Sequence, residues 1–229
     1  MKIKKKILIL GSTGSIGASA LNVIKRYRGA IDIICLSTNR NYKKLLVQSK
    51  VFNVKNLIIN DYNNFKKAKK LLKNRKIRLY SNVTEFLKEN NKKIDLVVIG
   101  ISGLDGLKPT LEVIPVTKIV ASANKESIIC GWKFINNKLK KYKTNFIPID
   151  SEHFSIWSLA RYESEAIDQI YITASGGPFL NKERKKLKNV RPIHAIKHPK
   201  WKMGKKISVD SATMVNKVFE TIEAKKIFN

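Results

Sequence analysis

The sequence predicts an α/β protein: a doubly wound, Rossmann-like domain over residues 1–149, followed by a partial α+β domain over residues 150–229. Short, continuous apolar segments alternate with amphipathic stretches up to residue 121, which is typical of parallel strands covered by helices on both faces. The first apolar segment runs into a glycine-rich loop that opens a helix. Polar loops follow later strands, at the edge where doubly wound folds bind ligands.

The expected elements follow the chain in order. Strands are predicted at residues 7–10, 31–37, 56–59, 96–99 and 118–121, and an extended run at 146–149. Helices are predicted at residues 18–27, 42–49, 64–72 and 83–89, the first with Leu21, Val23 and Ile24 on one side. After a short helix that ends near residue 161, a further strand is expected at 170–173 and a solvated helix at 182–188.

Composition narrows the classes of function. The 229 residues include 46 Lys+Arg and 17 Asp+Glu, a net charge of +29 that would suit nucleic acid or an anionic membrane. The basic residues are spread over nearly every segment, without a basic arm, zinc-ligand set or RNA-binding aromatic signature, so we expect no specific nucleic acid and no membrane partner. Cys35 and Cys130 lie in apolar surroundings and suit the cytoplasm. The apolar run at 7–10 is too short for a signal peptide.

The loop after the first strand indicates a nucleotide. Gly11, Gly14 and Gly17 are spaced three apart between a strand and a helix. Glycines there allow close approach of a pyrophosphate, and the amides at the helix start favour its negative charge. The alternative is a purely structural glycine turn.

The end of the second strand indicates which dinucleotide binds. NAD-binding folds usually place an acidic residue there for the ribose hydroxyls, whereas this chain has Thr38, Asn39, Arg40 and Asn41. Arg40 fits a 2′-phosphate, which favours NADP. A surface arginine in a very basic protein is the alternative.

Carboxylates at the end of the 146–149 run indicate a metal. Asp150 and Glu152 would share one face of an extended backbone, and hard oxygen donors suit Mg²⁺ or Mn²⁺. His153 could orient a ligand or move a proton, and Glu220 is a candidate third carboxylate. Lys125 opens a helix, where a cation is unfavourable unless an anion is near, so a phosphate or carboxylate contact is expected. A capped turn at residues 150–153 is the alternative.

Together these motifs resemble the 1-deoxy-D-xylulose 5-phosphate reductoisomerase family. The matching runs are residues 11–17, 123–127, 148–153, 175–179, 198–204 and 207–217, in the family's order. The resemblance implies NADPH- and divalent-metal-dependent conversion of 1-deoxyxylulose 5-phosphate to 2-C-methylerythritol 4-phosphate, an early step of non-mevalonate isoprenoid synthesis. It also implies a homodimer for the full-length family.

The resemblance assigns roles to named residues. It implies cofactor contacts by Gly11, Thr13, Gly14, Ser15, Ile16, Asn39, Arg40, Asn41, Asn124, Glu126 and Gly204. It implies metal ligation by Asp150, Glu152 and Glu220. It implies substrate contacts by Lys125, Ser151, Glu152, Ser175, His198, Trp201, Ser211, Asn216 and Lys217. The catalytic residues would be Lys125, Glu152 and His153.

The chain departs from the family pattern at several positions. Asn39 stands where a glycine is usual, Phe154 replaces an asparagine, and Val218-Phe219 replaces Gly-Leu before Glu220. The segment between His153 and Ser175 is shorter than usual, and a C-terminal part of the family, including a helical domain, is expected to be absent. An inactive remnant that binds only NADP or a partner is therefore an alternative, and a basic nucleic-acid-binding protein is a third.

Overall fold

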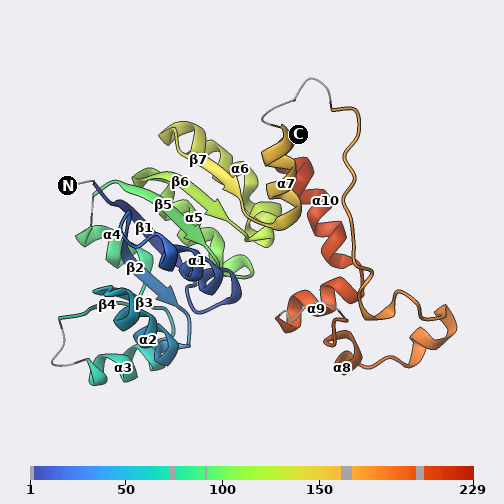
Figure 1. Ribbon diagram of the computed structural model, residues 1–229, viewed down its shortest axis with the longest axis horizontal. Helices are drawn as coiled ribbons and strands as arrows, with labels where there is room; N and C mark the ends of the chain where they lie inside the picture. Colours follow the sequence, from blue (N-terminus) through green and yellow to red (C-terminus); the bar gives the residue numbers. More distant parts are fainter. Residues whose placement is uncertain (1–2, 73–75, 91, 161–166, 200–203) are drawn as a thin grey trace. The chain divides into compact units, whose positions relative to one another are not determined.

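A computed structural model describes residues 3–72, 76–90, 92–160, 167–199 and 204–229. The chain divides into two compact units, Met1–Asp150 and Ser151–Asn229 (Figure 1).

Among the described residues, the first unit contains one seven-stranded parallel sheet. Its strands are β1 (Lys5–Leu10), β2 (Ile31–Thr38), β3 (Asn56–Ile59), β4 (Arg78–Tyr80), β5 (Ile94–Ile99), β6 (Thr117–Ser122) and β7 (Asn145–Pro148). The strand order is β4-β3-β2-β1-β5-β6-β7, and every pair is parallel (Figure 1). The chain reverses its direction of winding between β1 and β5. In such a sheet, ligands bind beyond the carboxyl ends of the two strands at this switch point.

Helices cover both faces of this sheet. They are α1 (Ser15–Arg26), α2 (Tyr42–Phe52), α3 (Tyr62–Leu71), α4 (Val83–Glu89), α5 (Leu107–Val113) and α6 (Lys125–Tyr142). Buried side chains of α1, α2 and α3 pack with one set of strand residues, and those of α4 and α6 pack with the other set. The two cores are made entirely of residues before Asp150, so the predicted doubly wound fold is confirmed.

Four of these helices begin within four residues of the carboxyl end of a strand, each at an Asn or Asp cap. Asn41, Asp61, Asn82 and Asn124 each accept a hydrogen bond from the backbone amide three residues later, at the starts of α2, α3, α4 and α6. Such caps satisfy amides that the first turn leaves without a partner. The strand-to-helix loops are therefore short and line one edge of the sheet.

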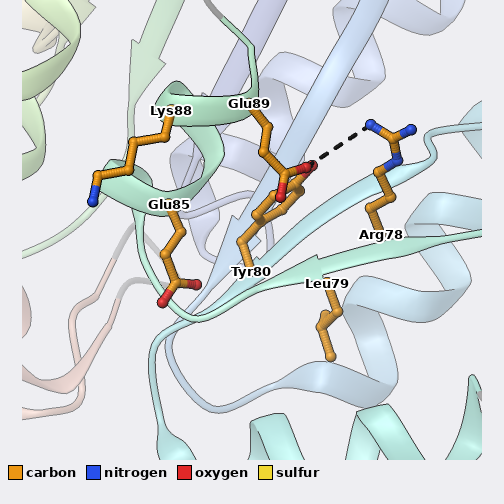
Figure 2. A pocket seen from close by; sticks show the side chains of 6 residues that line it. All are labelled: Arg78, Leu79, Tyr80, Glu85, Lys88 and Glu89. Carbon is orange, nitrogen blue, oxygen red and sulfur yellow. Dashed lines mark hydrogen bonds and ion pairs between the residues drawn. The ribbon is translucent and has the colours of Figure 1, made fainter.

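The edge strand β4 and helix α4 line a shallow pocket (Figure 2). Glu89 accepts a 2.9 Å hydrogen bond from the Tyr80 hydroxyl and lies 3.9 Å from an Arg78 nitrogen. Burial and then the Glu89 hydrogen bond raise the pKa of Tyr80. The Glu85 carboxylate accepts hydrogen bonds from both the amide and the hydroxyl of Ser81. These contacts join α4 to the sheet edge.

Over its described residues, the second unit consists of helices joined by irregular segments. It contains α7 (Ser151–Ala160), the short 3-10 helices η4 (Gly177–Phe179) and η5 (Arg184–Asn189), α8 (Pro192–Ala195), α9 (Lys205–Ala212) and α10 (Val215–Phe228). The strand predicted at 170–173 is wrong, because residues 167–176 form no ladder. A strand needs a hydrogen-bonding neighbour, and no other described segment of this unit is a strand.

Two smaller expectations also change. The basic stretch expected as a helix at 182–188 is the 3-10 helix η5. In α1, Leu21 and Ile24 are buried as predicted, whereas Val23 is 58% exposed. No helix of the described residues is both long and apolar enough to span a bilayer.

Candidate functional site

The loop from β1 to α1 lies at the switch point of the sheet. Gly11 has φ +80°, and a Cβ placed on it would lie 2.6 Å from the carbonyl oxygen of Gly100, the residue that follows β5. A Cβ on Gly17 would lie 2.4 Å from the Gly11 oxygen. Both positions therefore require glycine. The expected strand, glycine loop and helix are present, and the loop is packed tightly against the end of β5.

A pocket of about 630 Å³ opens beside this loop. Its lining includes Gly11, Thr13 and Gly14 of the loop and Asn39 beyond β2. The segments after β3, β4 and β5 also contribute, through Asn60, Asn82, Val83, Thr84, Gly100, Ile101 and Ser102. A pocket that extends across the strand ends from β4 to β5 is the shape that a dinucleotide occupies in a doubly wound fold.

The turn after β2 contains a candidate reader of a 2′-phosphate. The Arg40 side chain is 79% exposed, and its Nε lies 3.9 Å from the Asp61 carboxylate. Asp61 also donates its backbone amide to the Asn39 carbonyl at 3.1 Å. Hydrogen bonding from the Asn64 amide is the main cause of the lowered pKa of Asp61, with Arg40 contributing. Arg40 is therefore tethered loosely and remains accessible to an anion.

Sequence reasoning missed a second cation at this turn. Lys44 of α2 donates a 2.8 Å hydrogen bond from Nζ to the Thr13 carbonyl of the glycine loop. The Thr13 hydroxyl is 2.7 Å from the Thr38 hydroxyl at the end of β2. The only signal in the sequence was the position of Lys44 in the first turn of the helix after Arg40. These contacts join the glycine loop to the turn after β2.

Three of the predicted residues lie where β6 leads into α6. Asn124 caps α6, and its Nδ2 donates to the Ile101 and Gly103 carbonyls at 2.7 and 2.8 Å. Asn124 therefore ties together the loops after β5 and β6. Glu126 lies in the first turn of α6. Lys125 Nζ is 3.2 Å from the Asp150 carboxylate, so the anion expected near this helix start includes a carboxylate of the protein itself.

In the second unit, Lys217 connects two predicted carboxylates. Lys217 Nζ is 3.2 Å from Glu152 Oε1 and forms an ion pair with Glu220 Oε2. Asn216 donates from Nδ2 to the other oxygen of Glu220. Val218, one of the departures from the family pattern, is 56% exposed, and α10 is continuous through it. The substitution therefore leaves Glu220 directed toward Lys217 and Asn216.

The side chain of His153 is fully buried against α10, the helix that carries Lys217 and Glu220. Its Nε2 is 2.9 Å from the backbone carbonyl of Glu220, and its Nδ1 is 3.5 Å from the carboxylate of Glu223. Sequence reasoning missed Glu223, although its place three residues after Glu220 puts both on one face of a helix. His153 therefore contacts α10 directly.

The other predicted substrate residues lie on several elements of the second unit. Ser151 donates a 2.5 Å hydrogen bond to Glu152, and both residues line a pocket of about 420 Å³ together with Leu159. Ser175 Oγ is 2.9 Å from His198 Nε2. Ser211 lies in the last turn of α9, and Gly204, a predicted cofactor contact, precedes that helix. Trp201 lies outside the described residues.

Comparison with known proteins identifies the family. The family profile described as 1-deoxy-D-xylulose 5-phosphate reductoisomerase matches residues 7–131. The profile described as the C-terminal domain of the same enzyme matches residues 146–228. The first match lies within the first unit. The second covers nearly all of the second unit and also residues 146–150 of the first.

Curated relatives include the 1-deoxy-D-xylulose 5-phosphate reductoisomerases of Pelagibacter ubique (strain HTCC1062) and Wolbachia pipientis wMel. The Pelagibacter protein is 58% identical over 98% of this chain and 59% of its own length. The Wolbachia protein is 41% identical over 98% of this chain and 58% of its own length. The chain thus spans less than two thirds of the relatives it matches.

Solved structures agree with these matches. The reductoisomerase from Zymomonas mobilis in complex with NADPH superposes with a TM-score of 0.87 at 34% identity, over 99% of this chain and 59% of that one. A DOX-P reductoisomerase in complex with NADPH, fosmidomycin and magnesium gives a TM-score of 0.86 at 32% identity, over 98% of this chain and 58% of that one. With its sheet, its glycine loop and both family profiles in agreement, this chain belongs to the 1-deoxy-D-xylulose 5-phosphate reductoisomerase family.

Proposed function

We propose that the protein converts 1-deoxy-D-xylulose 5-phosphate to 2-C-methyl-D-erythritol 4-phosphate, with NADPH and a divalent metal ion. The observation that carries this proposal is that Lys217, a single cation, connects Glu152 and Glu220 in the second unit of a family member. Two carboxylates arranged around one positive charge are a suitable environment for a metal.

The first unit would bind NADPH. Gly11, Thr13, Gly14, Ser15 and Ile16 would hold the pyrophosphate, because Gly11 packs too closely on Gly100 for a side chain and the loop leads into a helix start. Asn39, Arg40 and Asn41 would receive the 2′-phosphate. Asn124, Glu126 and Gly204 would complete the contacts. The bound cofactor supplies the hydride.

The metal would be held by Asp150, Glu152 and Glu220. These are hard oxygen donors, and Asp150 precedes Glu152 by two residues in the chain. A bound metal would supply a Lewis acid for the carbonyl group of the substrate. Asn216 would keep Glu220 oriented, because it donates to the oxygen that Lys217 does not use.

The remaining residues would bind the sugar phosphate. Lys125 and Ser151 would contact its reacting end. Ser175, Ser211, Asn216 and Lys217 would hold its phosphate. His198 and Trp201, which precede α9 in the chain, would contact the substrate. Binding energy from a remote phosphate can be used to orient the reacting carbons. His153 would hold α10 in position, since both of its ring nitrogens face that helix.

The test is oxidation of NADPH by the purified chain, supplied with 1-deoxy-D-xylulose 5-phosphate and Mn²⁺. We expect turnover that Glu152→Gln abolishes and that Glu183→Gln, an exposed control in the same unit, leaves unchanged. NADPH binding without turnover by the unaltered chain would favour the alternative, a protein that only binds the cofactor or a partner.

A further inference from the structure

Lys217 occupies a defined position between two proposed metal ligands. Its Nζ is 3.2 Å from Glu152 Oε1 and pairs with Glu220 Oε2. The Lys217 side chain is 17% exposed, and those of Glu152 and Glu220 are 25% and 2% exposed. The ammonium is therefore largely withdrawn from water and contacts both carboxylates.

This arrangement has an electrostatic reason. A carboxylate as buried as that of Glu220 is costly unless a positive charge or hydrogen-bond donors compensate it. Lys217 supplies the charge, and Asn216 supplies a donor to the other oxygen. The ammonium thus neutralises charge that a divalent metal would neutralise when bound.

The metal and the ammonium cannot both hold these oxygens. Divalent magnesium binds oxygen ligands at about 2.0–2.1 Å in a nearly fixed geometry. It would repel an ammonium at hydrogen-bond distance from the same two carboxylates. Asn216 is neutral and uses the other oxygen of Glu220, so it can keep its contact when Lys217 leaves.

We propose that Lys217 is an internal counter-cation that occupies the metal's place in the metal-free protein and is displaced when a divalent metal binds. The displaced ammonium then binds an anionic group of the substrate, so that metal binding prepares the site for that group. This inference rests on the proposed function, because it takes Glu152 and Glu220 as metal ligands.

The first test measures Mn²⁺ affinity by electron paramagnetic resonance, in the absence of substrate and cofactor. Lys217→Met removes the competitor, and we expect it to bind Mn²⁺ about tenfold more tightly than the unaltered protein, within the usual range of couplings between ligands. Lys217→Arg keeps the charge and should stay within about threefold of the unaltered protein, below that range.

A matched control separates local competition from net charge. Lys226→Met removes the same charge from the last turn of the same helix, where the lysine is exposed. At physiological salt, exposed charges are screened over about 8 Å, so this variant should bind Mn²⁺ like the unaltered protein. Equal tightening in Lys217→Met and Lys226→Met would overturn the inference.

The second test uses the unaltered chain and does not depend on how a variant folds. An amine-reactive reagent, with mass spectrometry of the labelled peptides, reports the accessibility of each lysine. We expect Lys217 to react more slowly than Lys226 without metal and severalfold faster after Mg²⁺ is added, while Lys226 is unchanged. Labelling of Lys217 that ignores Mg²⁺ would overturn the inference.

The outcomes distinguish the two proposals. If the unaltered protein and Lys217→Met both bind Mn²⁺ with the same affinity, Lys217 does not compete and the metal site stands without this inference. If neither binds Mn²⁺, the metal site itself is wrong and the inference falls with it. Tighter binding by Lys217→Met together with metal-dependent labelling supports both.

Discussion

Nδ1 of His153 lies 3.5 Å from the carboxylate of Glu223, and neither side chain is exposed to solvent. Nε2 of the same ring is 2.9 Å from the Glu220 carbonyl, which can only accept a hydrogen bond, so Nε2 carries a proton and donates it. His153 lies in the first turn of α7, next to Glu152. Its imidazole therefore joins α7 to the turn of α10 that carries Glu220.

We expect Glu223→Ala to destabilise the second unit by about 3 kcal/mol, because removing one partner of a buried pair leaves the other uncompensated. Hydrogen exchange of the α7 and α10 amides measures the loss directly. Glu183→Ala, at an exposed site, should change stability by less than about 0.5 kcal/mol. If both variants behave alike, the His153–Glu223 contact contributes little.

Arg40→Ala should weaken NADPH binding by about 1–3 kcal/mol through the lost charge-assisted contact, and leave NADH nearly unaffected. Titration of both nucleotides measures the difference. Arg78→Ala is a matched control, because Arg78 is similarly exposed and also lies 3.9 Å from a single carboxylate (Figure 2). An equal loss for NADPH and NADH would mean that Arg40 does not read the 2′-phosphate.

Asp150→Asn, Glu152→Gln and Glu220→Gln should each weaken Mn²⁺ binding and leave NADPH binding intact, because each replaces a charged oxygen ligand by a neutral amide. Calorimetric titration with the metal and the nucleotide separates the two sites. Asp210→Asn, which changes a carboxylate paired with Lys206, is the control. Unchanged metal affinity in Glu220→Gln would remove Glu220 from the ligand set.

Asp95 should contribute to stability in a pH-dependent way. It accepts hydrogen bonds from Lys118 Nζ at 2.7 Å and from the Lys6 amide at 2.8 Å, and these, Lys118 first, lower its pKa. A depressed pKa in the folded state means that the stabilisation is present above the ordinary value of 3.8 and disappears as the pH falls below it.

Asp95→Asn should therefore cost about 0.5–1 kcal/mol at neutral pH, since the carboxylate is partly solvent-exposed, and almost nothing in strong acid. Denaturant unfolding at several pH values measures this. Asp32→Asn, at an exposed position of β2, is the control for the substitution itself. A loss that does not vary with pH would show that the charge of Asp95 is not involved.

The fragment 1–150 should fold and bind NADPH by itself. Both hydrophobic cores consist of residues from this range, and every strand of the sheet lies within it. Cooperative unfolding of the purified fragment, and an NADPH affinity close to that of the full chain, are the expected results. An unfolded fragment would show that the first unit depends on residues after Asp150.

Local sequence pattern predicted six of the seven strands, the helices α1 to α4 and the start of α6, but not the three-residue strand β4 or the helix α5. Continuous apolar strands, glycines three apart and Asn or Asp before a helix are local features that act over a few residues. They also located Arg40 and the pair Asp150 and Glu152, because both follow predicted strands.

Which charges meet depends on how distant parts of the chain pack together. Nothing in the local pattern shows that Lys217 pairs with Glu152, 65 residues earlier, or that His153 faces Glu223. Local pattern also failed at 170–173, where β-branched and aromatic residues predicted a strand that lacks a partner among the described residues. Strand pairing and buried ion pairs depend on neighbours distant in sequence, so they are settled by packing of the whole unit and not by the residues at one position.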